Sequence, residues 1–318
     1  NLDSLAKGGA PARAQELLER IEALYKEGYY QIAPDIVSYN SVLQAWATAT
    51  QGQGQAQAQG HKRALELLYL LEEKQQTQKN SKNNNNLQPN LISYNTCMHA
   101  LAKRGLYQDA EQLLERMQLR GIHPDTTTYN TLLNAYAQSK ERDAAPKAEA
   151  KLKQIMSMSQ VEEVQGEEAQ VEVEVDTQSF NSVIQAWTKS KNNQASKRAL
   201  QLLNHMEQMA QAGNSRVKPD VYSYATVIQS LVAQLRRQRM TATRPMMKSQ
   251  SSNNSVNSAE HNHAKEEEQT SPVPTPTQDD IEDPAQMVLQ LLQRMEQQHQ
   301  IQPNSVILTS VMAALGWA

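Results

Sequence analysis

Apolar residues recur along this chain with the period of an α-helix. In residues 38–46, the side chains of Tyr39, Val42, Leu43 and Trp46 stand at positions i, i+3, i+4 and i+7, a spacing that places them on one helix face. Related phrases recur at 93–101, 128–136, 179–187 and 223–231, and in a weaker form at 307–315. The pattern predicts a helix in each segment.

A second apolar pattern follows each first one. Residues Ala110, Leu113, Leu114 and Met117 show it most clearly. Related segments start at Ala14, Ala64, Ala199 and Val288, and residues 148–155 are a poorer copy in which Lys151 replaces an apolar residue. Two helices in each unit predict an all-α chain of helical hairpins, each of which buries one face against its neighbours.

Glycine and proline mark the ends of these units. In the most compact unit, 91–125, Gly105 is expected to end the first helix and Gly121 the second, and Pro124 prevents continuation. Proline followed by Asp or Asn closes most units, at Pro34-Asp35, Pro89-Asn90, Pro124-Asp125, Pro219-Asp220 and Pro303-Asn304. No proline precedes Asp176, so that boundary lacks the signal that marks the others.

These signals divide the chain into units of unequal length. The units are a partial repeat at 1–35 that holds a second helix, repeats at 36–90, 91–125, 126–176, 177–220 and 221–304, and a truncated repeat at 305–318. The extra residues are rich in Gln, Asn, Ser and Pro at 50–60, 75–88 and 241–280, a composition typical of disordered loops. The Val/Glu alternation at 171–175 is interpreted as an acidic loop rather than a short strand.

Composition and charge agree with a soluble array. Hydrophobic residues make up 39% and aromatic residues 5% of the chain, which is too polar for one large core. No apolar run approaches the roughly 18 to 20 residues that span a bilayer. The net charge is −3, but residues 162–176 and 259–283 carry −7 each. The remaining, moderately basic body is compatible with a polyanionic partner.

Catalytic chemistry has almost no signal in the sequence. The single cysteine, Cys97, lies on an apolar stripe and is expected to be a small buried hydrophobe. It excludes a disulfide framework, as expected in a reducing compartment. His261 and His263 lack a third metal ligand, so we expect no enzyme activity, no cofactor and no metal. The chain starts at Asn1, inside a repeat, so we also expect a fragment whose targeting segment lies outside it.

Three phrases of the unit 91–125 resemble one known family. Tyr-Asn-Thr at 94–96, Ala-x-x-Leu-Leu-x-x-Met at 110–117 and Gly-Ile-x-Pro-Asp at 121–125 are similar to the pentatricopeptide repeat. The Trp-x-x-Leu-Gly-x-x-Tyr phrase of tetratricopeptide repeats is absent. The resemblance implies a right-handed superhelical solenoid of antiparallel helix-turn-helix repeats, with the first helices on the concave side.

The resemblance also implies binding of single-stranded RNA, one base per repeat. The base-reading residues would be the one after each head aromatic residue and the last one of each unit. They are paired as Asn40 with Asn90, Asn95 with Asp125, Asn130 with Asp176, Asn181 with Asp220, and Ala225 with Asn304. The second residue of each unit would sandwich the base: Val37, Ile92, Thr127, Gln178 and Tyr222.

The hydrogen-bond donors and acceptors of each pair predict which base it binds. Asn reaches a pyrimidine with a donor and an acceptor, and Asp can only accept. An Asn/Asp pair therefore favours uracil, whose N3 carries a hydrogen, whereas Asn40/Asn90 favours cytosine and tolerates uracil. Ala225/Asn304 lacks the reading amide. The predicted target is a pyrimidine followed by three uracils.

Structural interpretations compete at the same positions. Asx residues favour turns and helix starts, but Ser38, Ser93, Thr128, Ser179 and Ser223 stand in the more cap-like place, which favours a reading role for the asparagines. The head aromatics Tyr39, Tyr94, Tyr129, Phe180 and Tyr224 are expected in the core. The main alternative function is a protein-interaction scaffold of tetratricopeptide type. For the RNA-binding function, the resemblance implies RNA processing, stability or translation in a mitochondrion or chloroplast.

Overall fold

A computed structural model describes residues 10–49, 59–78, 87–162, 173–242, 283–297 and 300–315, together with Ser4. The chain divides into two compact units, residues 1–227 and 228–318. The predicted all-α fold is confirmed, because the regular elements of the described residues are helices. None of those helices is long and apolar enough to cross a membrane.

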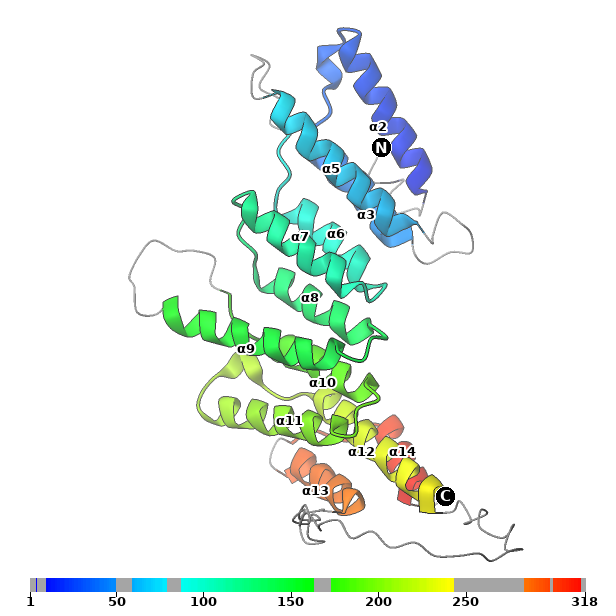
Figure 1. Ribbon diagram of the computed structural model, residues 1–318, viewed down its shortest axis with the longest axis vertical. Helices are drawn as coiled ribbons and strands as arrows, with labels where there is room; N and C mark the ends of the chain where they lie inside the picture. Colours follow the sequence, from blue (N-terminus) through cyan, green and yellow to red (C-terminus); the bar gives the residue numbers. More distant parts are fainter. Residues whose placement is uncertain are drawn as a thin grey trace, which may run out of the picture. The chain divides into compact units, whose positions relative to one another are not determined.

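The first unit is a series of antiparallel helical hairpins (Figure 1). Its elements are α2 (Pro11–Lys26), η1 (Tyr30–Ile32), α3 (Ile36–Thr48), α5 (Gly60–Gln78), α6 (Leu91–Ala102), α7 (Tyr107–Leu119), α8 (Thr126–Gln138), α9 (Ala144–Glu162), α10 (Thr177–Lys189), α11 (Ala195–Gln211) and η3 (Ser215–Val217). Helix α12 (Val221–Ala242) begins in this unit and continues into the second.

Packing within the first unit follows a simple rule. The first helices α3, α6, α8 and α10 contact one another in order, and each also packs against its own partner, α5, α7, α9 or α11. Each of α5, α7 and α9 also touches the next first helix along the chain. The first helices therefore form a continuous row, and every hairpin buries its apolar face against two neighbours.

The second unit holds the rest of α12 with α13 (Pro284–Gln297) and α14 (Ser305–Leu315). Helix α13 buries Val288, Leu291 and Met295, and α14 buries Ile307 and Val311. Both helices occupy segments that the repeated apolar patterns predict.

The head aromatic residues lie in the core, as predicted. Tyr39, Tyr94, Phe180 and Tyr224 are fully buried. Three of their hydroxyls donate to a glutamate on the preceding second helix: Tyr39 to Glu22, Tyr94 to Glu72 and Tyr224 to Glu207, at 2.5, 2.5 and 2.6 Å. The aromatic rings thus fill the space between hairpins, and these three tyrosines also satisfy their hydroxyls there.

One of those glutamates joins two second helices. Glu72 on α5 is 1% exposed and forms ion pairs with Arg116 of α7 and with Arg120 just beyond it. A buried carboxylate is costly unless it is paired and hydrogen-bonded. Glu72 meets both conditions through Tyr94 and the two arginines, so it ties α5, α6 and the end of α7 together.

The insertions are shorter than their composition indicates. Helix α5 runs to Gln78 and α12 to Ala242, so the ends of the predicted loops 75–88 and 241–280 are helical. These residues extend helices that are already formed, and each added residue gains one backbone hydrogen bond without a new nucleation cost. Most of these loops lies outside the described residues. Val173 to Asp176 form neither helix nor strand.

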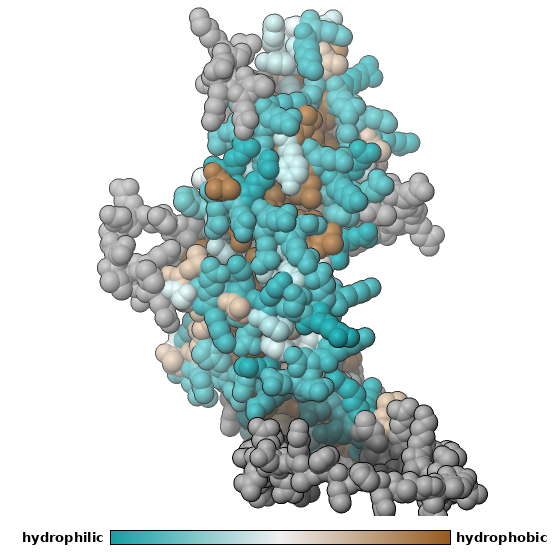
Figure 2. Space-filling model, viewed as in Figure 1, coloured by the Kyte–Doolittle hydropathy of each residue, from teal (hydrophilic) through white to brown (hydrophobic). Residues whose placement is uncertain are grey.

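The space-filling view agrees with this burial. The face in view is mostly hydrophilic, with hydrophobic residues in small separate patches (Figure 2). The apolar stripe residues such as Leu43, Leu113 and Leu133 are buried between helices.

The two predicted helix-ending glycines have the backbone that only glycine adopts readily. Gly105 has φ +68° and Gly121 has φ +73°. At Gly105 an added Cβ would lie 2.6 Å from the carbonyl oxygen of Gln138 in α8, whereas at Gly121 it would meet nothing within 4 Å. Gly105 therefore also allows the close approach of two hairpins.

We expect Gly105→Ala to destabilise the chain more than Gly121→Ala. The Gly121 variant carries only backbone strain, about 1 kcal/mol. The Gly105 variant adds a clash with α8, about 1–3 kcal/mol more. Thermal melting followed by helical circular dichroism measures the difference. Equal melting temperatures for the two variants would show that the contact with Gln138 relaxes without cost.

Candidate nucleic-acid interface

Each first helix of the first unit begins with an Asp or Asn that caps it. The side chain of Asp125 accepts a hydrogen bond from the backbone N–H of Thr128 at 2.7 Å, and the Thr128 hydroxyl accepts the N–H of Asp125 at 3.2 Å. This reciprocal pair is a capping box. The same box forms at Asn90, Asp176 and Asp220, and Asp35 caps α3 through Ser38.

The cap geometry corrects one expectation from the sequence. The Ser and Thr residues were expected in the cap-like place. Instead the last residue of the preceding unit is the N-cap, and the Ser or Thr is the third helical residue. The reason is backbone conformation, since Asp35, Asn90, Asp125 and Asp176 are extended while the hydroxyl residues are already helical. The helix-start role of the Asx residues is therefore real.

The residues paired by the sequence meet at these caps. The side-chain amide nitrogen of Asn95, on α6, donates to Asp125 Oδ1 at 3.2 Å, and Asn181 donates to Asp220 Oδ1 at 3.2 Å. Asn130 donates to both carboxylate oxygens of Asp176, at 3.1 and 2.9 Å. Asn40 donates to Asn90 Oδ1 at 3.4 Å. Four predicted pairs are thus four contacts between adjacent first helices.

A hydroxyl completes each contact. The Oγ atoms of Ser93, Ser179 and Ser223 donate to the amide oxygens of Asn40, Asn130 and Asn181 at 2.7, 2.6 and 2.7 Å. Thr128 does the same for Asn95 at 2.7 Å. The amide oxygen of each asparagine is thereby used, and the contact to the cap uses an amide hydrogen.

The remaining polar atoms have a definite pattern. Within the described residues, the bonds at Asn95/Asp125 and Asn181/Asp220 leave one amide hydrogen and one carboxylate oxygen, Oδ2, at each site. At Asn40/Asn90 the remaining groups are amide hydrogens only, because Asn90 Oδ1 is the cap acceptor. The sites therefore differ in whether they can accept a hydrogen bond.

Exposed side chains flank these recessed polar pairs. Asn130 is 4% and Asn181 8% exposed, while Val37, Ile92 and Tyr222 are 65%, 61% and 48% exposed. Thr127 and Gln178 are also exposed. All five residues predicted to sandwich a base thus stand at the surface on the first turn of a first helix.

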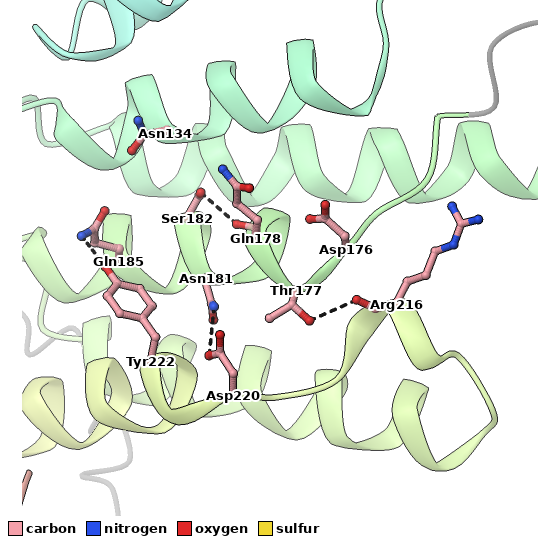
Figure 3. Close-up of a pocket in the computed structure, with 10 residues that line it drawn as sticks. All are labelled: Asn134, Asp176, Thr177, Gln178, Asn181, Ser182, Gln185, Arg216, Asp220 and Tyr222. Atoms are coloured by element: carbon pink, nitrogen blue, oxygen red, sulfur yellow. Dashed lines mark hydrogen bonds between the residues drawn. The ribbon is translucent and has the colours of Figure 1, made fainter. Parts of the chain in front are cut away.

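The site between α10 and α12 forms a cavity of about 580 Å³. It brings Asn181, Asp220, Gln178 and Tyr222 together (Figure 3). Asp176, predicted as the partner of Asn130, also lines it. The further lining residues were not predicted from the sequence: Asn134, Thr177, Ser182, Gln185 and Arg216.

Two of these missed residues differ in how they could have been found. Gln185 stands four residues after Asn181, on the same helix face, and its amide donates to the Tyr222 hydroxyl at 2.7 Å. Helical spacing alone would have indicated it. Arg216 lies in the extra residues of this unit, which have no counterpart in the repeat pattern, so no signal pointed to it. Thr177 holds that segment through the carbonyl oxygens of Arg216 and Lys218 at 3.0 and 2.7 Å.

Two of the cap carboxylates, those of Asp35 and Asp125, have a lowered pKa. Burial raises the pKa of Asp125, but hydrogen bonds from Thr128 and Asn95 outweigh it and leave this pKa below its ordinary value. The hydrogen bond from the Ser38 side chain lowers the pKa of Asp35. Asp125 therefore acts at neutral pH as an acceptor only.

Other candidate residues have simpler positions. Cys97 is fully buried, its thiol faces the carbonyl oxygen of Ala64, and burial raises its pKa, so it is the expected core residue. Ala225 belongs to the first unit, and Asn304, which caps α14 through Ile307, to the second. His261 and His263 lie outside the described residues, within which no cluster of metal ligands occurs.

The repeats are similar in sequence to those of known proteins. Residues 89–138 match the model of the PPR repeat family. A pentatricopeptide repeat-containing protein of Arabidopsis thaliana is 29% identical over 136 residues, 43% of this chain and 20% of the relative. A second one, named mitochondrial, is 26% identical over 176 residues, 54% of this chain and 33% of the relative. A third, named chloroplastic, is 34% identical over 59 residues, 19% of this chain and 12% of the relative.

Solved structures were compared as well. The crystal structure of the pentatricopeptide repeat protein PPR10 from maize matches with a TM-score of 0.47 and 18% identity, over 98% of this chain and 35% of that one. The same protein in complex with an 18-nt psaJ RNA element gives a TM-score of 0.29 and 13% identity, over 96% of this chain and 40% of that one.

The chain spans between a fifth and a third of the first two relatives. The matched segment, residues 89–138, is a pentatricopeptide repeat, and longer parts of the chain are similar to proteins named for this repeat.

Proposed function

We propose that this chain binds single-stranded RNA along its row of first helices, one base at each junction between repeats. The observation that carries the proposal is the recurrence of one polar pair, Asn with Asp or Asn, at four successive junctions of the first unit. Each pair keeps donors or acceptors for a ligand and is flanked by exposed side chains. Modular recognition of one base per helical repeat needs this arrangement.

The unused atoms favour a particular base at each junction. At Asn95/Asp125 the amide hydrogen suits the O2 of a pyrimidine, and Asp125 Oδ2 suits the N3–H of uracil. Cytosine has an acceptor at N3 and would face the carboxylate with its lone pair. At Asn40/Asn90 the amide hydrogens of Asn90 suit the N3 of cytosine. We therefore propose a cytosine or uracil followed by three uracils, read 5′ to 3′ along the repeats.

The three Asn/Asp junctions are not equivalent. The amide of Asn130 donates to both oxygens of Asp176, whereas the amides of Asn95 and Asn181 each donate to one oxygen of their partner. A uracil at Asp176 must share a carboxylate oxygen that already accepts a hydrogen bond from Asn130. We therefore propose that this junction discriminates least of the three. The pair Ala225/Asn304 has no reading amide and contributes little.

The proposed role is in organellar RNA processing, stability or translation. It is supported by the names of two relatives, one mitochondrial and one chloroplastic, and by the match of residues 89–138 to the PPR repeat family. The competing function is a scaffold that holds a protein or peptide on the same row of helices.

Titrations with labelled strands test the proposal directly. We expect a strand carrying cytosine followed by three uracils to bind at least about tenfold more tightly than oligo(A), because one matched base contact is worth about 1–3 kcal/mol. Fluorescence anisotropy measures both affinities. Equal or absent binding of the two strands would instead favour the protein scaffold.

The sharpest expectation concerns Asp125→Asn. We expect the preference at the one base assigned to this junction to move from uracil towards cytosine by about tenfold, because the amide supplies a donor where the carboxylate accepts. The fold should persist, since Asn90 caps α6 in the same way. Paired titrations with strands that differ only at that base measure the ratio.

The reciprocal variant Asn90→Asp is the matched control. It should move the preference at its own base from cytosine towards uracil and leave the base at Asp125 unaffected. If both variants bind and melt like the wild type and neither ratio changes, the Asx residues are helix caps only.

A further inference from the structure

The hydroxyl at the third position of a first helix can make two kinds of contact. One is within the cap of its own helix, and the other is to the asparagine on the preceding first helix. Thr128 belongs to the capping box of α8, and its Oγ1 atom also lies 2.7 Å from Oδ1 of Asn95 on α6. The equivalent contacts are Ser93 to Asn40, Ser179 to Asn130 and Ser223 to Asn181. The contact is therefore made at every described junction of the first unit that has a reading asparagine.

The hydroxyl of Thr128 lies between two acceptors. Its Oγ1 atom is 2.7 Å from Asn95 Oδ1 and 2.6 Å from Asp125 Oδ1, and its one hydrogen is shared between them. An amide oxygen can only accept, so the hydroxyl is the donor that the structure gives to Asn95 Oδ1. The amide oxygen of Asn95 is therefore held beside the cap of α8.

The carboxylate enforces the same orientation. Rotating the Asn95 amide by half a turn would place its oxygen, instead of its nitrogen, about 3 Å from Asp125 Oδ1, and two acceptors would face each other. The hydroxyl would then face an NH₂ group. Hydroxyl and carboxylate thus select one rotamer and one amide orientation, with a hydrogen left for a ligand.

We propose that Ser93, Thr128, Ser179 and Ser223 are positioning residues for base selection, an inference that rests on the proposed function. Each holds the asparagine of the preceding repeat at a fixed depth, so that the site accepts pyrimidines and excludes purines. The Watson–Crick edge of a purine lies farther from its sugar than that of a pyrimidine. A clamped asparagine therefore leaves no room for guanine, although guanine presents an N–H that Asp125 can accept.

This inference separates two kinds of discrimination. Asp125 distinguishes uracil from cytosine, because it can only accept a hydrogen bond from the base. The Thr128 hydroxyl distinguishes uracil from guanine, because it fixes the position of Asn95. A change of the hydroxyl must therefore alter the second ratio and leave the first in place, which a purely structural role in capping would not do.

The test uses Thr128→Val, which removes the hydroxyl at nearly constant shape. At the base assigned to Asn95/Asp125, we expect the uracil-to-guanine affinity ratio to fall about three- to tenfold, the equilibrium effect of losing one hydrogen bond. The uracil-to-cytosine ratio should change less than about twofold, a fraction of that effect. Thr128→Ser should restore the wild-type ratios, because it returns the donor.

Ser38→Val is the matched control. Ser38 donates to Asp35 at 2.6 Å, and in the described part of the chain it makes no contact with a reading asparagine. It changes a hydroxyl at the same helix position and should leave both base ratios unchanged. Ser93→Ala, read at the base assigned to Asn40, provides a second and smaller perturbation with the same expected loss of pyrimidine selection.

The outcomes are distinguishable. If Thr128→Val or Ser93→Ala folds, binds and keeps its pyrimidine-to-purine ratio, the hydroxyl only caps the helix and the inference is overturned. If Ser38→Val changes the ratio as strongly, the effect comes from stability and the inference also fails. A wild-type chain that binds no RNA contradicts the proposed function itself.

Discussion

The start of each first helix imposes the constraint on which the rest of this structure depends. A helix begins with backbone N–H groups that have no partner within it, and here an Asp or Asn at the end of the preceding unit accepts one of them. Because the first helices lie side by side, each cap also lies beside the helix before it. One carboxylate therefore serves folding and faces the candidate interface.

This double use explains the polarity of the junctions. A buried or half-buried amide needs partners, and each asparagine finds a hydroxyl for its oxygen and a cap for its nitrogen. The junction is satisfied without a ligand and still has unused atoms on its open side. A site of this kind is preorganised, so little side-chain freedom is lost when a base binds.

A second set of contacts joins neighbouring hairpins through the second helices. Buried tyrosines donate hydrogen bonds to glutamates of the preceding second helix, and Glu72 also forms ion pairs with Arg116 and Arg120. These contacts join neighbouring hairpins only. Stability is then a sum of local terms between neighbours, which is why residues can be added between the helices of a unit without altering the junctions.

The sequence by itself determined the helices and their order, and its resemblance to a known repeat indicated which side chains would be paired between neighbouring units. The apolar stripe of Tyr39, Val42 and Leu43 and the positive φ values of Gly105 and Gly121 follow from local rules of periodicity and backbone geometry. The ends of the insertions did not follow, because α5 and α12 continue into polar sequence, where an existing helix extends at little cost.

Only the tertiary structure decided how the reading residues are held. The hydroxyl of Thr128 and the amide of Asn95 are 33 residues apart, and those of Ser93 and Asn40 are 53 apart. Nothing local in either phrase shows that they share a hydrogen bond. The cap role of Asp125 and its contact with Asn95 likewise depend on how closely two helices approach. Periodicity specifies which face a side chain occupies, whereas the packing of neighbouring hairpins specifies which atoms on two such faces meet.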